Sequence, residues 1–143
     1  IDSRADQFPA AVPGNVRKVS NPDLAVCLEQ APDGAFVLAM THSHALDEDI
    51  MARALLQQRF AYCGVIGSKT KRARFLKRLK ARGLNDTLTA NMVCPVGVTS
   101  VKSKQPAAIA AGIAVDLLVR DEAGNHQQAA AAGGLAQKLT LGQ

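Results

Sequence analysis

The residues best suited to binding a ligand lie where a glycine turn leads into a strongly basic segment. They are Gly64, Gly67, Ser68, Lys69, Lys71 and Arg72. Glycines let an anionic group approach the backbone, and a helix that begins after such a turn presents free N–H groups and a partial positive charge. The spacing is not that of a Walker A loop, so it does not indicate ATP hydrolysis. We therefore predict a site for a phosphate-like anion, with a tight turn before a solvated basic helix as the structural alternative.

A second cluster combines two histidines with hydroxyl groups and a carboxylate. Its members are Thr41, His42, Ser43, His44 and Asp47. An imidazole can transfer a proton or contact a phosphate near neutral pH, and His44 and Asp47 share a helix face on which a metal could bind. In the structural alternative, Thr41 and Ser43 cap a helix and Asp47 offsets its dipole. The sequence leaves these three interpretations open.

Two smaller signals complete the candidate site. Asp2 and Arg4 lie where the second strand of a dinucleotide-binding fold would end, and an acid there can accept a hydrogen bond from a ribose hydroxyl. The glycine-rich turn that should precede them by about 20 residues does not occur in the sequence. A solvated chain end is therefore the alternative. Cys94 ends the last expected strand and could face the same crevice, although a buried cysteine is more often inert.

An alternation of strands and helices must position these residues. The expected strands are 36–40, 61–66 and 92–98, and helices are expected at 21–30 and 68–83 and after Ser43 and Pro106. This order predicts an α/β fold with a doubly wound, mostly parallel, Rossmann-like sheet and helices on both faces. The first residues read as the end of a strand, so the first strand–helix unit is expected to be missing. In such sheets ligands bind beyond the carboxyl ends of the strands, where the polar clusters fall.

Composition limits the remaining choices. The 143 residues divide into one expected domain at 1–122 and a low-complexity tail at 123–143, either helical or disordered. The net charge of +5 is compatible with nucleic acid, but the basic residues concentrate in one segment and aromatic residues are scarce, so we expect no nucleic-acid partner. The absence of a long apolar run and of a signal peptide predicts a cytoplasmic protein without a membrane partner. Three cysteines without a C-x-x-C pair fit a reducing compartment, and a homodimer is compatible with the sequence.

Together these motifs resemble the C-terminal Rossmann-like domain of the xanthine dehydrogenase accessory proteins, the XdhC/CoxI family. The most specific part reads Gly-Val-Ile-Gly-Ser-Lys-Thr-Lys-Arg-Ala-Arg-Phe and begins at Gly64. Further matching segments are Ile-Asp-Ser-Arg at 1–4, Thr-His-Ser-His-Ala-Leu-Asp at 41–47, Cys-Pro-Val-Gly at 94–97 and Pro-Ala-Ala-Ile-Ala at 106–110. The resemblance extends to about residue 118. The loop at 99–104 departs from it, because the family commonly has glycines there.

The resemblance implies a cofactor chaperone rather than an enzyme. Proteins of this family look like carriers that bind molybdenum cofactor, protect it while its sulfido ligand is installed, and pass it on. The implied cargo is molybdopterin, a phosphorylated and anionic pterin. The implied partners are an apo-xanthine dehydrogenase-type enzyme and a sulfur-donating enzyme.

The binding residues implied by the resemblance divide into two groups. The phosphate would suit the N–H groups at Gly67, Ser68 and Lys69, with charge added by Lys71 and Arg72. The pterin or the metal-bound oxygens would be bonded by Thr41, His42 and His44. The alternative is an NAD(P)-binding Rossmann oxidoreductase domain, in which Asp2 bonds the ribose and a histidine acts as the acid.

Overall fold

The computed structural model describes the backbone of residues 1–24, 26–98 and 100–140, with side chains as far as residue 125. The chain forms two compact units, Ile1–Pro95 and Val96–Gln143. All three strands belong to the first unit. The first unit also contains every residue of the predicted site.

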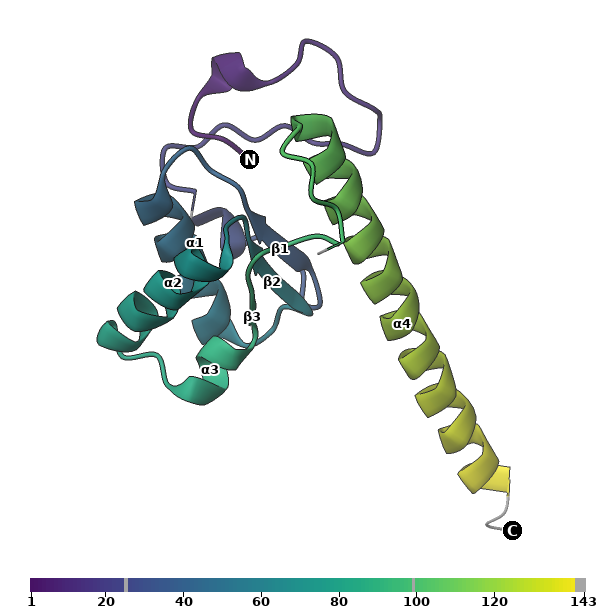
Figure 1. The fold of residues 1–143 in the computed structure, drawn as a ribbon. Helices are drawn as coiled ribbons and strands as arrows, with labels where there is room; N and C mark the ends of the chain where they lie inside the picture. Colours follow the sequence, from purple (N-terminus) through teal and green to yellow (C-terminus); the bar gives the residue numbers. More distant parts are fainter. Residues whose placement is uncertain (25, 99, 141–143) are drawn as a thin grey trace. The chain divides into compact units, whose positions relative to one another are not determined.

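A three-stranded parallel sheet forms the centre of the first unit (Figure 1). Its strands, in spatial order, are β1 (Phe36–Ala39), β2 (Tyr62–Val65) and β3 (Met92–Val93). Val37 pairs with Cys63, and Gly64 pairs with Val93. β2 is buried along its whole length, as expected of an apolar strand in the middle of a parallel sheet. The predicted α/β class with a parallel, Rossmann-like sheet is confirmed.

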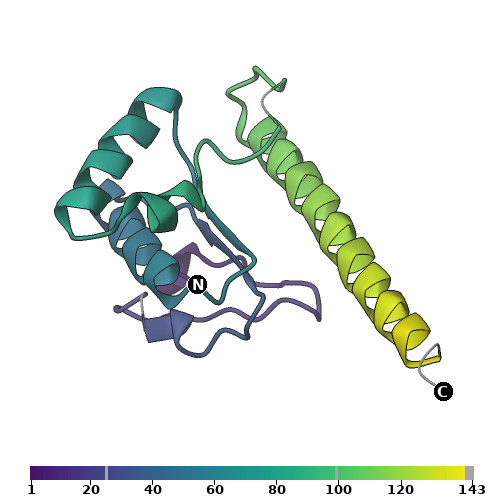
Figure 2. The ribbon, with the colours of Figure 1, turned by 90° about the horizontal axis from the view of Figure 1, so that it is seen from below.

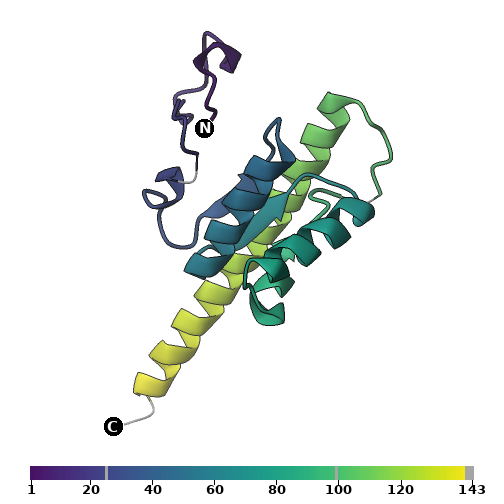
Figure 3. The same ribbon diagram turned by 90° about the vertical axis from the view of Figure 1, so that its left-hand side faces the viewer.

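Two helices of the first unit lie side by side over one face of the sheet (Figure 3). They are α1 (His44–Gln57), which follows β1, and α2 (Lys69–Ala81), which follows β2. Met51 of α1, Val65 of β2 and Leu79 of α2 are fully buried. This apolar layer fixes the helices on the sheet, because each such side chain contributes about 1.5–3 kcal/mol when it leaves water.

Side-chain caps start the helices of the first unit. Ser43 and Ser68 each accept a hydrogen bond from a backbone N–H of the first turn, which confirms the helix starts predicted there. Asn85 does the same for a short helix, α3 (Asp86–Ala90), that the sequence analysis did not predict. β3 then ends at Val93, so the expected extension of this strand to residue 98 is wrong. Pro95 has no N–H to donate to a ladder, which explains the early end.

The helix expected at residues 21–30 is also wrong. Its described part contains a single 3-10 turn, η2 (Val26–Leu28). To continue as an α-helix, the Leu28 carbonyl would need an N–H donor four residues later, where Pro32 has none. The Ala31 N–H donates to that carbonyl at 3.2 Å, and the guanidinium of Arg59, from the connection between α1 and β2, donates to it as well. The segment is therefore held by 3-10 backbone bonds and by a side chain from the connection between α1 and β2.

The first residues form less regular structure than the strand end predicted for them. Asp2 and Ser20 form a single parallel bridge, and a 3-10 turn, η1 (Ala5–Gln7), follows. The Asp2 N–H donates to the Val19 carbonyl at 3.1 Å, and the Asn21 N–H donates to the Asp2 carbonyl at 3.3 Å. The two ends of the segment at residues 1–20 are therefore hydrogen-bonded to each other.

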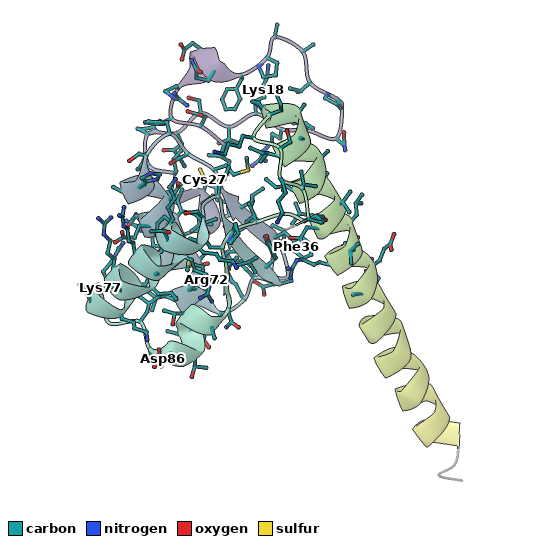
Figure 4. All side chains as sticks on the ribbon, viewed as in Figure 1. Lys18, Cys27, Phe36, Arg72, Lys77 and Asp86 are labelled. Atoms are coloured by element: carbon teal, nitrogen blue, oxygen red, sulfur yellow. The ribbon has the colours of Figure 1, made fainter. Side chains whose placement is uncertain are left out.

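A cavity of about 370 Å³ runs along the free edge of β1. Every residue from 35 to 42 lines it, and because consecutive strand residues face opposite sides of a sheet, the cavity must follow the edge of the strand. The other lining residues include Leu24, Cys27 and Leu28; Cys27 and Phe36 are labelled in Figure 4. Within the described part of the chain, β1 pairs with β2 alone.

The described part of the second unit is dominated by one continuous helix, α4 (Pro106–Thr140), visible in Figure 2. It includes the backbone of residues 123–140, which the sequence analysis assigned to a tail. The turn before it uses Gly97 at φ 85°, where a Cβ would lie 3.2 Å from the backbone nitrogen of Ile113. Among the residues that the structure describes, no helix has both the length and the hydropathy of a membrane span.

Candidate functional site

The predicted site residues gather at the carboxyl ends of the strands. Thr41 follows β1, Gly67 follows β2, and Cys94 directly follows β3. Because the three strands are parallel neighbours, these positions share one edge of the sheet. The Ile66 N–H donates to the Ala39 carbonyl at 3.0 Å, which holds the first two loops together where they begin. This is the edge at which open α/β sheets bind ligands.

Polar side chains of the β1–α1 loop hold that loop in shape. The Thr41 hydroxyl donates to the Ser43 carbonyl at 2.9 Å and accepts from the Ser43 N–H at 3.1 Å. The Asp47 carboxylate, only 1 % exposed, accepts a bond from the Thr41 N–H at 2.8 Å. These bonds agree with the structural interpretation of Thr41 and Asp47. Within the described residues the imidazoles of His42 and His44 make no hydrogen bond, and both are exposed, so they are free to contact a ligand.

Asp2, Thr41 and His42 line one end of the cavity beside β1. The Asp2 carboxylate already has a partner, because the Arg4 side chain donates to both of its oxygens at 3.0 Å. Hydrogen bonds from the side chain and backbone of Arg4 lower the pKa of Asp2 from 3.8 to about 2. Asp2 is therefore an ionised and paired carboxylate at neutral pH, and a ribose hydroxyl would have to share it with Arg4.

Gly67 makes room for a neighbour within the protein. A Cβ at Gly67 would lie 2.8 Å from the Cys94 sulfur and 3.3 Å from the Lys71 Cβ. Burial raises the pKa of the Cys94 thiol, an effect that the charges of Arg72 and Lys71 oppose. Cys94 is thus a neutral thiol packed against the turn, where it donates a weak hydrogen bond to the carbonyl of the exposed residue Ser68 at 4.0 Å.

Gly64 lies inside β2 rather than in the turn. It is buried, and a Cβ there would clash with the ring of Tyr62. The absence of a side chain at Gly64 therefore lets an aromatic ring pack within the sheet. Of the two predicted glycines, only Gly67 reaches the ligand-binding edge.

The first turn of α2 combines free N–H groups with positive charge. The Ser68 hydroxyl accepts from the Lys71 N–H at 3.2 Å, and the Arg72 N–H donates to the Ser68 carbonyl at 2.8 Å. The N–H groups of Lys69 and Thr70 have no acceptor within the helix. The first turn contains no acid, and within the described residues Lys69, Lys71 and Arg72 form no ion pair. The helix dipole and these cations together produce a positive potential at the sheet edge.

His44 and Lys71 meet in a separate, smaller pocket of about 80 Å³, between the start of α1 and α2. Arg74, Phe75 and Arg78 complete its lining. Lys71, Arg74 and Arg78 follow helical spacing, so they form one stripe on α2. The sequence analysis did not include Arg74 or Arg78 in the site. Their spacing from Lys71 was the signal that could have indicated them.

The metal interpretation of His44 and Asp47 gains no support. In the part of the chain that the structure describes, no group of three or more His, Cys, Asp and Glu side chains is placed to hold a metal ion. His44 lines a pocket with three cations, whereas Asp47 is buried against the loop. The side chains of His44 and Asp47 therefore lie in different surroundings.

Comparison with known families agrees with this arrangement of strands, turns and helices. The family model of the XdhC Rossmann domain matches residues 1–117. The chain belongs to this family. A search of curated proteins found no match to the chain. The match covers the whole first unit and the first part of α4, and it therefore includes every residue of the candidate site.

The candidate site of this XdhC Rossmann domain thus consists of three neighbouring places rather than one crevice. They are the cavity end with Asp2, Thr41 and His42, the exposed first turn of α2, and the small pocket with His44 and Lys71. Arg4 contributes through its bonds to Asp2, and Cys94 packs beneath the turn. The first turn of α2 is the place where uncompensated charge and free N–H groups coincide.

Proposed function

We propose that this XdhC Rossmann domain binds molybdenum cofactor and delivers it to an apo-xanthine dehydrogenase-type enzyme. The observation that carries the proposal is the first turn of α2, at the ligand-binding edge of the sheet, where free N–H groups lie beside three cations that have no acidic partner among the described residues. Molybdopterin carries a phosphate, the kind of group that a helix start of this type binds. Membership of the XdhC family supports the same function.

Each part of the site has a binding role in this proposal. The N–H groups of Lys69 and Thr70 would hold the phosphate, and Lys71 and Arg72 would add charge. His42, at the nearby cavity end, would contact the polar edge of the pterin. The molybdenum centre supplies oxidation–reduction chemistry to the recipient enzyme once it is installed there. The domain itself binds and orients its cargo and needs no catalytic group.

The exposure of the turn suits a carrier. Ser68, Lys69 and Thr70 are exposed, so a phosphate there would remain reachable from solvent. A sulfur-donating enzyme could reach the cargo before delivery, and the recipient enzyme could remove it. Charge-based binding at an exposed site is also readily reversed.

The nicotinamide alternative has weaker support from the geometry. It depends on Asp2 accepting hydrogen bonds from a ribose, and both carboxylate oxygens of Asp2 already accept bonds from Arg4. The first turn of α2 would still suit the phosphates of a dinucleotide. The identity of the co-purified ligand therefore decides between the two cargoes.

The proposal is tested by the double substitution Lys71→Ala/Arg72→Ala in the full-length protein. We expect co-purified molybdenum and pterin to fall at least about tenfold, because each lost charge-assisted contact is worth roughly 1.5–3 kcal/mol. Metal analysis and pterin fluorescence measure the loss. The matched control, Lys77→Ala/Lys80→Ala, removes the same charge further along the same helix and should retain the cofactor.

Circular dichroism shows whether each variant is folded. Folded Lys71→Ala/Arg72→Ala protein that keeps its cofactor would refute the assigned site. Recovery of a nicotinamide dinucleotide instead of a pterin would replace the proposed cargo.

A further inference from the structure

The charge of α2 is unusual for a surface helix. Its thirteen residues contain seven cations and no acid. Lys71 and Arg74 are three residues apart, and Arg74 and Arg78 are four apart, so like charges are neighbours on the helix surface and repel each other. An ordinary solvated surface mixes both signs. The excess of positive charge therefore suggests a partner outside the helix.

Acidic side chains of the first unit compensate only the second half of this charge. The ion pairs of α2 are Arg78 with Glu48 of α1 at 3.3 Å and Lys80 with Asp86 of α3, and just after the helix Arg82 pairs with Asp49 of α1 at 2.8 Å. In the described part of the chain, the cations of α2 without an ion pair are Lys69, Lys71, Arg72, Arg74 and Lys77. The uncompensated charge thus extends from the first turn to the middle of the helix.

A phosphate at the first turn does not account for the whole of this charge. At a rise of about 1.5 Å per residue, Arg74 and Lys77 lie roughly 8 and 12 Å along the axis from Lys69. Both side chains are exposed, and Lys77 is labelled on the outer side of α2 in Figure 4. Arg74 and Lys77 therefore form a second positive region beyond a phosphate bound at the first turn.

The small pocket beside Arg74 indicates the chemistry of a partner. Its volume of about 80 Å³ suits the end of one side chain rather than a whole small molecule. Phe75, 4 % exposed, offers an apolar wall, and Arg74 and Arg78 add guanidinium groups. A glutamate side chain matches this combination, because its methylene groups can pack on Phe75 while its carboxylate bonds to a guanidinium.

Nucleic acid matches the same surface less well. Single strands usually stack their bases on exposed aromatic rings, and Phe75 is buried. The positive region is also confined to part of one helix, whereas binding to a duplex usually involves several phosphate contacts along the backbone. An acidic protein surface requires only a few carboxylates at the spacing of one helix face.

We infer that Arg74, Lys77 and the pocket beside them form a docking surface for an acidic segment of the enzyme that receives the cofactor. The inference rests on the proposed function, because it takes the recipient enzyme as the partner. Complementary charge would speed the encounter and orient the two proteins. Docking would then use the middle of α2 and the pocket beside it, and cargo binding would use the first turn, with Lys71 adjoining both.

The test measures binding of the full-length protein to immobilised apo-xanthine dehydrogenase-type enzyme by surface plasmon resonance. Arg74→Glu/Lys77→Glu should weaken binding at least about tenfold at low salt, and the difference from wild type should shrink as salt screens the charges. The milder Arg74→Gln/Lys77→Gln should give an intermediate loss and guards against misfolding of the reversed variant. The matched control, Arg17→Glu/Lys104→Glu, reverses two exposed cations outside the surface and should bind like wild type apart from the general effect of net charge.

Three results would overturn the inference. They are undiminished binding by folded Arg74 and Lys77 variants, failure of the wild-type protein to bind the apo-enzyme, and stronger binding of the wild-type protein to a 20-base-pair duplex DNA than to the apo-enzyme. Cofactor retention is measured in the same preparations and should be unchanged in the single variant Lys77→Glu, because Lys77 lies outside all three places of the candidate site. Wild-type protein without cofactor would count against the proposed cargo alone, while the binding data would still decide the docking surface.

Discussion

At the scale of single residues, the buried Asp47 connects the start of α1 to the loop that carries His42. One carboxylate oxygen accepts a bond from the Thr41 N–H, and the other is buried without a hydrogen-bond partner among the described residues. Asp47 also lies in the first turn of α1, where the helix dipole favours negative charge. A residue predicted to offset a dipole therefore also determines the shape of a loop at the candidate site.

The Asp2–Arg4 pair gives a pH-dependent prediction. Because hydrogen bonds from Arg4 hold the pKa of Asp2 near 2, Arg4→Gln should return that pKa towards 3.8. The sign follows from the lowered pKa: the stabilisation by this pair is present above pH 3.8 and is lost as the pH falls through 2. NMR titration of the Asp2 carboxyl carbon measures the shift.

An unchanged pKa for Asp2 in Arg4→Gln would show that the side-chain hydrogen bonds from Arg4 are not the main cause, because the backbone N–H of residue 4 still donates to the carboxylate. Asp6→Asn is the matched control, because it removes another charge near the chain start without touching the bond between Arg4 and the Asp2 carboxylate. Its effect on the Asp2 pKa should be small.

At the scale of secondary-structure elements, two glycines show how a motif residue can serve internal packing. Gly64 lets the ring of Tyr62 lie against β2, and Gly67 lets Cys94 approach the turn before α2. Packing within the protein therefore explains both glycines without a bound ligand. What distinguishes the turn is instead the combination of the Ser68 cap, the free N–H groups and the basic first turn that follows it.

Gly64→Ala tests the packing role directly. The added methyl group would clash with the buried Tyr62 ring, so we expect a loss of about 1–3 kcal/mol in the free energy of unfolding. Tyr62→Leu should reduce that loss when the two substitutions are combined, because it removes the ring. Chemical denaturation of the four proteins measures the coupling.

Gly14→Ala is the matched control, since nothing lies within 4 Å of a Cβ at that position. Equal stability of Gly64→Ala and Gly14→Ala proteins would contradict the packing role of Gly64.

At the scale of the whole molecule, the sequence predicted the order and type of the elements better than it predicted the side-chain contacts between them. Apolar runs and helix caps predicted the parallel strands and the starts of α1 and α2, because burial and capping leave local patterns. In place of the helix expected at 21–30 the described residues form a 3-10 turn, and its Leu28 carbonyl accepts a bond from Arg59, 31 residues away. Such long-range contacts leave no local pattern.

For the candidate site, too, the position could be predicted but the side-chain contacts could not. Its place at the carboxyl ends of the strands could be predicted, since any parallel sheet brings those ends to one edge. The pairing of Asp2 with Arg4, the contact of Gly67 with Cys94 and the pocket beside Arg74 depend on side-chain directions. They required the structure.

The open edge of β1 has a consequence for handling the protein. Among the described residues β1 pairs with a strand on one side only, and a strand edge without a partner is a template for aggregation. We expect the 143-residue chain to form larger particles as it is concentrated, measurable by dynamic light scattering. Met40 is half-exposed beside the same edge, so Met40→Lys should delay this growth by adding charge. Equal aggregation of the wild-type and Met40→Lys proteins would show that another surface causes the association.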